Sequence, residues 1–488
     1  MATEIPSNAA RLVVRDLVVA TGGRLVGGDA AMEVVGVSTD TRALGVGSAF
    51  VALAGEKYDG HAFLRTAVDA GAKLLVVSRV PDDVPEGVAL LIVADTLAAL
   101  GAIARVHRRR WGGAAHARGA RAVVAVGGSA GKTTTTRAIA AVLESECPGD
   151  VHATRGNLNN QIGVPMTLLA LEERHRFAIV EVGTNHRGEV AALGAVVEPD
   201  VAIVTLAAAE HLEGLGDLDQ VAQEEGDLFA AVREGGIVVG NAEDARVVAQ
   251  LGRGRARVRA KYGSVPGADV RIVAREPRGL AGSVVMLVVG AVAEPRELLV
   301  PLLGRAGALA AVAAITVVEL VLDRAVDLVR ASAALAAINA ARDGRLVPVE
   351  RADTTIVLDD SYNANPGSVR SSVETAREIA DALGRRLVLV LGEMRELGAS
   401  SLTEHDEVGR DVASCHAAHV FAIAGDAARF CDRAREAGVA AEFVATSAEA
   451  VPLVLAAVLP GDVVLVKGSR SVGTERVVAA LLAATPAA

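Results

Sequence analysis

The sequence predicts an α/β protein of three domains, and three observations support this prediction. A chain of 488 residues exceeds what one hydrophobic core usually holds, so several domains are expected. Hydrophobic residues make up 51% of the chain but aromatic residues only 2%, so its cores depend on aliphatic side chains. Short β-branched runs alternate with helical stretches, which is typical of mostly parallel sheets covered by helices.

Composition excludes several classes of protein. A formal net charge of −10 argues against non-specific nucleic-acid binding, which needs clustered positive charge. Cys147, Cys415 and Cys431 are too widely spaced for a disulfide framework, which favours a reducing cytoplasm. Residues 1–20 have no sustained apolar core and do not resemble a signal peptide. The apolar run Ala306–Val318 is too short to span a bilayer and predicts a buried helix.

Residues 1–118 are expected to form a small α/β domain. Strands are predicted at Ala49–Leu53, Lys73–Val77 and Leu90–Val93, with helices at His61–Ala70 and Thr96–Arg110. The polar run STDTR contains Ser38, Thr39 and Arg42, and GEKYDGH follows at 55–61. These residues are suited to contacting a nucleotide phosphate, and equally to forming a capped turn beside a surface loop. Both interpretations stay open at this point.

The stretch Ala122–Thr136, AVVAVGGSAGKTTTT, has the pattern of a phosphate-binding loop. A β-branched run ends at glycines and leads into Lys132 at a helix start, where amides and an ammonium can hold an anion. Three residues separate Gly127 from Gly131, one fewer than in the standard loop. Lys132 is one of only five lysines, which indicates a specific use of its compact charge. The expected triphosphate contacts are Gly128, Ser129, Ala130, Gly131, Lys132, Thr133 and Thr134.

The central domain, residues 119–340, continues the alternation. Strands are predicted at Phe177–Val182, Val201–Leu206 and Ile237–Gly240, before a β-rich patch from Val258 to Val300. Ligands of parallel sheets bind at the carboxyl ends of strands, where Glu181 and His211 follow two of these runs. A turn rich in amides predicts ligand contacts, with a capped loop as the alternative; it contains Asn157, Asn159, Asn160 and Gln161.

Residues 341–488 are expected to form a Rossmann-like, doubly wound domain. Strands are predicted at Thr355–Asp359, Leu387–Leu391, Val420–Ala424, Glu442–Ala445 and Val463–Lys467. Polar runs follow three of them: DDSYNANP from Asp359, GEMRELG from Gly392 and KGSR from Lys467. The charged groups are therefore predicted to gather on one rim of the sheet.

With these motifs in order, the chain resembles the Mur ligase family of peptidoglycan synthesis over essentially its whole length. The similarity rests on STDTR, GEKYDGH, GGSAGKTTTT, TRGNLNNQIGVPMTLL, EVGTNHRGEV, HLEGLGDL, DDSYNANPGS, GEMRELG and VKGSRSVG. NLNN, DDSYNANP and KGSR together resemble the branch that joins D-alanyl-D-alanine to UDP-N-acetylmuramoyl-tripeptide. The resemblance implies a monomeric, cytoplasmic ligase that uses ATP and two Mg²⁺ ions, forms an acyl phosphate and releases ADP and phosphate. The three domains would bind the UDP-linked precursor, ATP and the dipeptide, in that order.

The resemblance also implies roles for single residues. The catalytic group would be Lys132, Glu181, His211 and Arg345, with Arg345 reaching the γ-phosphate and Asp360 and Asn363 facing the nucleotide. The metal ligands would be Thr133, Glu181, His211 and Glu225. The substrates would contact Ser38, Thr39, Arg42, Asn157, Asn159, Asn160, His186, Asn365, Lys467 and Arg470, the last two holding the incoming dipeptide. Groups from different domains meet only after closure.

The sequence departs from the family pattern at two places. Where the family carries a lysine that becomes a carbamate, this chain has Glu225, in QEEGD. Our hypothesis is that Glu225 supplies the same anionic role directly or through a water. Where the family has a G-R-H-N-x-x-N helix start against adenosine, this chain has apolar residues or glycine, from Gly304 to Ala310. These departures leave two alternatives open, a weakly active or inactive paralogue that binds the precursor and a Mur-type ligase with another acceptor. An unrelated P-loop ATPase would not explain NLNN or DDSYNANP.

Overall fold

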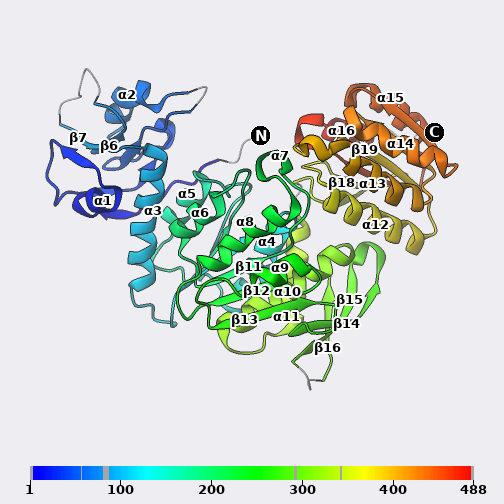
Figure 1. Ribbon diagram of the computed structural model, residues 1–488, viewed down its shortest axis with the longest axis horizontal. Helices are drawn as coiled ribbons and strands as arrows, with labels where there is room; N and C mark the ends of the chain where they lie inside the picture. Colours follow the sequence, from blue (N-terminus) through cyan, green and yellow to red (C-terminus); the bar gives the residue numbers. More distant parts are fainter. Residues whose placement is uncertain (1–3, 56–57, 81–86, 291–293, 341–342, 485–488) are drawn as a thin grey trace.

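The computed structural model describes residues 4–55, 58–80, 87–290, 294–340 and 343–484, and it contains three regions, each built on its own sheet (Figure 1). The N-terminal region lies at one side of the central region and the third region at the other. The predicted three-domain α/β organisation is confirmed. The three sheets fall within residues 1–118, 119–340 and 341–488, whose limits as folding units stay a prediction.

The N-terminal sheet has the strand order β2-β7-β6-β5-β4, and a separate antiparallel pair joins β1 to β3. The strands are β1 (Arg11–Val13), β2 (Arg24–Val26), β3 (Glu33–Val35), β4 (Val37–Ser38), β5 (Ala49–Val51), β6 (Leu74–Val77) and β7 (Ala89–Ile92). The helices are α1 (Val14–Thr21), α2 (Leu64–Asp69) and α3 (Thr96–Gly113). The strands at β5, β6 and β7 agree with the prediction to within two residues at each end, whereas β1 to β4 were not predicted.

The central sheet has nine strands in the order β16-β15-β14-β13-β12-β11-β8-β10-β9. The seven neighbouring strands from the edge strand β9 to β14 are parallel, and β15 and β16 add antiparallel pairs at the other edge. The strands are β8 (Ala122–Gly127), β9 (Val151–Ala153), β10 (Phe177–Glu181), β11 (Val201–Val204), β12 (Ile237–Asn241), β13 (Val258–Gly263), β14 (Val270–Pro277), β15 (Ser283–Val289) and β16 (Arg296–Val300).

Helices cover both faces of this sheet, because alternate residues of each strand enter two separate cores. Val124 and Val126 pack with α4 (Lys132–Glu146) and α10 (Gly304–Leu322), whereas Val123 and Ala125 share a core with the helices of the other face. Those helices are α5 (Gly163–Leu169), α6 (Glu189–Val197) and α8 (Leu218–Ala230); α7 (Leu212–Leu215), α9 (Ala245–Gln250) and α11 (Leu328–Ala336) complete the region.

The helix α10 contains the predicted buried run Ala306–Val318. Among the described residues it is the one helix that is long and apolar enough to cross a membrane, but 61% of its most apolar window is buried inside the protein. It packs along α4, and Val312 and Ile315 are fully buried between the two helices and the sheet. The prediction of a buried helix is confirmed.

The third sheet has the order β17-β18-β22-β19-β20-β21, parallel except at the edge strand β17. The strands are β17 (Val347–Glu350), β18 (Ile356–Asp360), β19 (Leu387–Gly392), β20 (His419–Ile423), β21 (Ala440–Val444) and β22 (Val463–Lys467). The helices are α12 (Pro366–Leu383), α13 (Ser401–Ser414), α14 (Ala428–Glu436), α15 (Ser447–Ala457) and α16 (Glu475–Ala483).

Different contacts join the neighbouring regions. On one side, the guanidinium of Arg108 in α3 is 2% exposed and donates to the Val197 and Glu198 carbonyl oxygens and to Asp200 Oδ2. On the other side, Arg275 in β14 forms a bidentate ion pair with Glu378 in α12, at 2.6 and 2.8 Å. The α3 helix is thereby held by a buried charge, and the third region by a partly exposed one.

Candidate active site

The loop between β8 and α4 has the shape that its glycines allow. Gly128 has a φ of +116°, and a Cβ there would meet Thr205 Oγ1 at 2.1 Å, so no other residue fits. Gly131, with a φ of +83°, begins α4, and Lys132 is its first residue. The loop therefore places a lysine at the start of a helix, as an anion-binding helix start requires, although the amides of Gly128 and Ser129 are bonded to Glu225 and Leu206.

Lys132 is held inside this loop. Its ammonium donates to the Gly128 carbonyl oxygen at 2.5 Å and lies 3.8 Å from Glu210 Oε2. Burial lowers the pKa of Lys132, but the carboxylates of Glu210, Glu225 and Glu181 outweigh it and hold the pKa above its ordinary value. The side chain is consequently a permanent cation at neutral pH.

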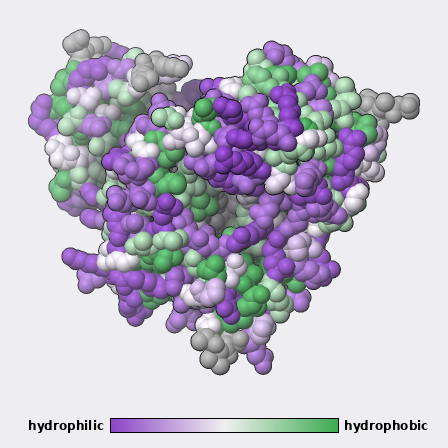
Figure 2. Space-filling model, turned by 45° about the vertical axis from the view of Figure 1, so that its right-hand side comes forward, coloured by the Kyte–Doolittle hydropathy of each residue, from purple (hydrophilic) through white to green (hydrophobic). Residues whose placement is uncertain are grey.

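A cavity of about 500 Å³ opens in front of Lys132, between the central and third regions. It collects most of the predicted site residues, namely Ser129, Ala130, Gly131, Lys132, Thr133, Thr134, Asn157, Asn159, Asn160, Glu181, His211, Arg345, Asp360, Asn363, Asn365 and Lys467. Arg470 lines an adjoining pocket that shares His211 and Asn365 with it. Figure 2 shows that hydrophilic residues cover much of the notched face between the three regions.

Some predicted residues do not line this cavity. His186 is exposed on the loop before α6, and Gly128 and Glu225 lie at the loop without reaching the cavity surface. Ser38, Thr39 and Arg42 belong to the N-terminal region. Arg42 forms a bidentate pair with Asp40, which also caps the short helical turn Thr41–Ala43, so the STDTR run forms the capped turn. Glu56 and Lys57 of GEKYDGH lie outside the described residues.

The amide-rich turn serves two purposes. Asn159 Nδ2 donates to Glu181 Oε1 at 2.8 Å, which orients the carboxylate at the end of β10. Asn160 Oδ1 instead accepts from the amides of Ile162 and Gly163 and begins α5. Asn160 therefore forms the capped loop, and a ligand contact from this turn stays a prediction.

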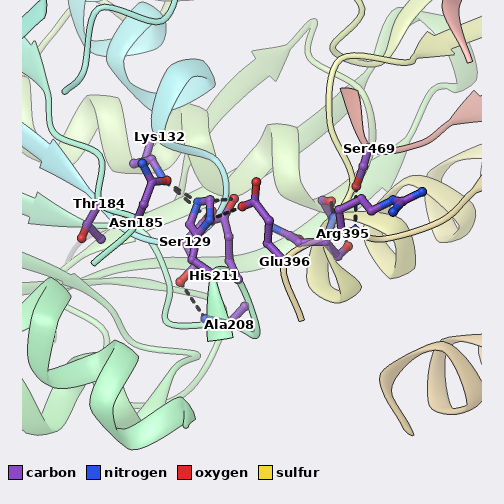
Figure 3. Close-up of polar contacts among 12 residues, drawn as sticks. Ser129, Lys132, Thr184, Asn185, Ala208, His211, Arg395, Glu396 and Ser469 are labelled. Carbon is purple, nitrogen blue, oxygen red and sulfur yellow. Dashed lines mark hydrogen bonds and ion pairs between the residues drawn. The ribbon is translucent and has the colours of Figure 1, made fainter. Parts of the chain in front are cut away.

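His211 connects the central region to the third region. It has a φ of +52°, an uncommon conformation for a residue with a side chain. Its Nδ1 forms an ion pair with Glu396 of the GEMRELG run, while Nε2 lies 3.8 Å from Glu210 Oε1 (Figure 3). One ring nitrogen is thus occupied by a carboxylate from the third region and the other faces the cavity.

The charged rim of the third sheet is largely bonded within the protein. Lys467 is 3% exposed, and its ammonium donates to Asp360 Oδ2 at 2.6 Å and to the Asn363 carbonyl oxygen at 3.0 Å. Asp360 Oδ2 also accepts from Ser372 Oγ. The Arg345 guanidinium lies 4.0 Å over the Tyr362 ring. Lys467 and Asp360 hold the ends of β22 and β18 together while both line the cavity, and their contacts with substrate or nucleotide stay predictions.

Glu225, proposed above as a metal ligand, has a different environment. Its side chain is 2% exposed, and Oε2 accepts from the Gly128 amide at 2.6 Å. Burial raises its pKa to about 7. Its neighbour Glu224 accepts from the amides of Gly188 and Val190 at the start of α6. Both carboxylates accept hydrogen bonds from backbone amides of loops. Neither Glu224 nor Glu210 was identified from the sequence, because neither residue is part of a motif that carries the family resemblance.

The wall expected to meet adenosine is built of small residues. Ala306, Gly307 and Ala310 at the start of α10 line the cavity, together with Asn241 and Tyr262 from β12 and β13. Burial raises the pKa of Tyr262. Among the described residues no group of three or more His, Cys, Asp or Glu side chains forms a ready-made metal site.

Comparison with known proteins places this geometry in a family. Three family models match, described as the Mur ligase family, catalytic domain (residues 33–108), the Mur ligase middle domain (126–318) and the Mur ligase, glutamate ligase domain (344–470). The UDP-N-acetylmuramoyl-tripeptide–D-alanyl-D-alanine ligase of Escherichia coli K12 is 37% identical over 470 residues, covering 94% of this chain and 96% of that protein. The ligase of the same name from Mycobacterium tuberculosis H37Rv is 33% identical, covering 92% of each chain.

Solved structures show the same similarity. MurF from Acinetobacter baumannii superposes with a TM-score of 0.83 at 29% identity, covering 97% of this chain and 99% of that one. MurF ligase from Thermotoga maritima, solved in complex with ADP, shares the fold with a TM-score of 0.75 at 23% identity, over 91% and 96% of the two chains. Sequence, family models and fold agree along nearly the whole chain, and this protein belongs to the Mur ligase family.

Proposed function

We propose that the protein is a cytoplasmic, monomeric ligase that joins D-alanyl-D-alanine to UDP-N-acetylmuramoyl-tripeptide at the expense of ATP. One observation carries the proposal: Lys132, a buried cation in an anion-binding loop, faces a cavity lined by both the central and the third regions. A cavity lined by two regions is suited to a reaction in which ATP and an amine must both reach the carboxylate of the tripeptide. The named activity of relatives that match more than 90% of the chain supports this choice.

The chemistry has two steps. The tripeptide carboxylate attacks the γ-phosphorus of ATP; a C–O–P linkage forms, the bond between the β- and γ-phosphates breaks, and ADP leaves. The amine of D-alanyl-D-alanine then attacks the acyl carbon; the C–N bond forms, inorganic phosphate leaves, and the amine proton passes to solvent. Both steps depend on positioning and on neutralising phosphate charge, more than on an acid or base.

The residues of the cavity are suited to these tasks. Lys132 and the amides of the loop hold the β- and γ-phosphates, and Arg345 lines the same cavity from the third region. Asn159 keeps the Glu181 carboxylate oriented towards the loop. In this proposal the N-terminal region, residues 1–118, binds the UDP-linked precursor, and residues 341–488 hold the dipeptide.

The residues also fit Mg²⁺, the ion the family resemblance implies. The Thr133 hydroxyl and the Glu181 carboxylate line the cavity beside Lys132, and they are oxygen ligands of the kind that Mg²⁺ prefers. Magnesium commonly binds through one or two carboxylates plus substrate phosphates and water, so the lack of a ready-made site among the described side chains agrees with this role. When bound, the ion neutralises phosphate charge and aligns the reacting oxygens.

The test is a direct assay. The purified chain is incubated with ATP, Mg²⁺, UDP-N-acetylmuramoyl-tripeptide and D-alanyl-D-alanine, and mass spectrometry follows the pentapeptide product. Lys132→Gln should lower kcat by about 10²–10³, as the loss of a single charge-stabilising donor does elsewhere. Lys261→Gln, at a half-buried lysine outside the cavity, is the matched control and should retain activity. Phosphate release without pentapeptide would indicate another acceptor, and precursor binding without either product would indicate the inactive paralogue.

A further inference from the structure

Three carboxylates surround Lys132, and they differ in what they contact. Glu225 accepts a hydrogen bond from the Gly128 amide and does not line the cavity. Glu181 lines the cavity and is oriented by Asn159. Glu210 also lines it, and its interactions are the longest of the three.

Glu210 lies between the Lys132 ammonium and the His211 ring. Its Oε2 is 3.8 Å from Lys132 Nζ, and its Oε1 is 3.8 Å from His211 Nε2. Neither distance is that of a hydrogen bond, and among the described residues no donor is bonded to either oxygen. The side chain is nevertheless only 13% exposed. A carboxylate this buried normally accepts hydrogen bonds, whereas Glu210 has, within the described part of the chain, only the longer contact with the Lys132 charge.

A carboxylate at this point opposes the binding of a bare triphosphate. The phosphates would approach Lys132 and meet a negative charge within a few ångströms, in surroundings where charges are poorly screened. A divalent cation placed between the carboxylate and the phosphate would turn this repulsion into attraction. The geometry around Glu210 is therefore unfavourable for nucleotide alone and favourable for nucleotide with metal.

We propose that Glu210, together with His211 Nε2, binds a divalent cation that accompanies the triphosphate, and that Glu210 rather than Glu225 supplies the anion expected beside this ion. The proposal rests on the ligase function above. Glu225 Oε2 accepts a hydrogen bond from the loop backbone, whereas Glu210 lines the cavity and its two oxygens lie 3.8 Å from Lys132 Nζ and His211 Nε2. The sequence could not separate the two, because position 210 lies just before the HLEG run and position 225 matches the family lysine.

The contact of His211 with the third region supports this assignment. Glu396 occupies Nδ1 (Figure 3), which leaves Nε2 as the nitrogen 3.8 Å from Glu210 Oε1. Histidines that bind metals characteristically place their second nitrogen against a carboxylate or carbonyl, which fixes the ring. The pair Glu210 and His211 thus has the supporting contact that a cation-binding residue needs.

The proposal is tested by measuring metal binding in the full chain without any acceptor substrate. Mn²⁺ is titrated into the protein saturated with a non-hydrolysable ATP analogue and followed by electron paramagnetic resonance. Glu210→Gln should weaken one Mn²⁺ site by about 10- to 100-fold. Glu210→Asp, which keeps the charge, should recover part of this loss. Glu225→Gln, and Glu213→Gln at an exposed carboxylate in α7, should retain the wild-type Mn²⁺ affinity.

A second titration uses the analogue in the presence of EDTA. Here Glu210→Gln should bind the analogue more tightly than the wild type, because the repulsion is gone, so the same substitution acts in opposite directions with and without metal. Unchanged Mn²⁺ affinity in Glu210→Gln, or loss of a Mn²⁺ site in Glu225→Gln, would overturn the proposal. A wild type that binds no analogue at all would overturn the ligase function itself. Circular dichroism of each variant establishes that it is folded.

Discussion

His211 of the central region and Glu396 of the third region form an ion pair across the boundary between the two sheets. A backbone hydrogen bond joins the same two segments, since the Glu213 amide donates to the Glu396 carbonyl oxygen at 3.3 Å. Glu396 has a φ of +66° and His211 a φ of +52°, so both residues adopt uncommon backbone conformations to meet. The orientation of the His211 ring therefore depends on where the third region lies.

Replacing Glu396 tests this dependence. Glu396→Gln should lower kcat/KM by about 10- to 100-fold, the usual effect of losing the partner that orients a ligand histidine. Since the Glu396 side chain is 60% exposed, its loss should change the free energy of unfolding by no more than about 1 kcal/mol. Steady-state kinetics and urea denaturation measure the two effects. Glu407→Gln, which removes a comparably exposed ion pair with Arg370, is the control; equal kinetics in both variants would contradict the coupling.

Position 225 predicts how the enzyme responds to bicarbonate. A lysine there would need carbon dioxide to become a carbamate, whereas Glu225 is a carboxylate from the start and already holds the Gly128 amide. Activity in buffer freed of carbon dioxide should therefore equal activity after bicarbonate is added. The product assay in the two buffers measures this, and a clear stimulation by bicarbonate would refute the interpretation.

His152 predicts a loss of stability in mild acid. Its ring is buried, with Nε2 3.0 Å from the Thr167 carbonyl oxygen and the His175 ring at 5.0 Å, and burial followed by the charge of His175 lowers its pKa to about 4. At a pH more than about one unit above 6.5 the group is neutral in both states and contributes no pH dependence. As the pH falls from about 6.5 to 4, the unfolded chain binds a proton that the folded protein does not, so roughly 3 kcal/mol of stability is lost.

The variant His152→Gln should flatten this part of the stability profile, because its side-chain amide can still donate to Thr167 but does not titrate. Urea denaturation at several pH values between 4 and 7 measures the slope. The exposed His416, substituted as His416→Asn, provides the control and should leave the slope unchanged. A slope that persists in His152→Gln would assign the acid sensitivity to another group.

The small side chains at the start of α10 offer no hydrogen bond to adenosine, so we expect weak binding of the nucleotide. A single substitution at Ala306 should strengthen it. Ala306 is exposed in the cavity, so Ala306→His adds a hydrogen-bonding ring without displacing a core residue. One such bond contributes about 1 kcal/mol, so KM for ATP should fall about fivefold. Ala306→Leu separates hydrogen bonding from bulk, and an equal fall in both variants would show that bulk alone is responsible. Initial rates at varied ATP measure both.

Features that lie within one short stretch of the sequence are predicted well, whereas contacts between residues far apart in the sequence are not. The loop at Lys132 and the strand β22 lie within single stretches whose pattern specifies them, and β22 appears with the predicted bounds. The short strands β2 and β4 have three and two residues, too few to show an alternation. The pairing of Lys467 with Asp360 joins residues 107 positions apart, and nothing in either motif indicates that they satisfy each other.

The same reason explains what the sequence did not show at the site. The metal role of Glu225 was inferred from a family position, whereas its contact with the Gly128 amide joins residues 97 positions apart. Glu210 was overlooked because it stands one residue before a recognised motif. Charge neighbours of Lys132 come from β10, from the turn before α7 and from α8, and only the folded chain brings these elements together.

The buried guanidinium of Arg108 has a consequence for dividing this protein into parts. A fragment that begins after residue 118 would lose α3 and with it the bonds of Arg108 to Asp200 and to the carbonyl oxygens at the end of α6, in addition to exposing the apolar surface that α3 covers. A fragment that ends before Thr96 would also lack α3, and here the N-terminal region would be the part left without this helix. Expression of separate pieces should therefore succeed near residue 340, where the joining charges are partly hydrated, and fail near residue 118. In a gene fusion or a domain exchange, the first two regions would have to be transferred together.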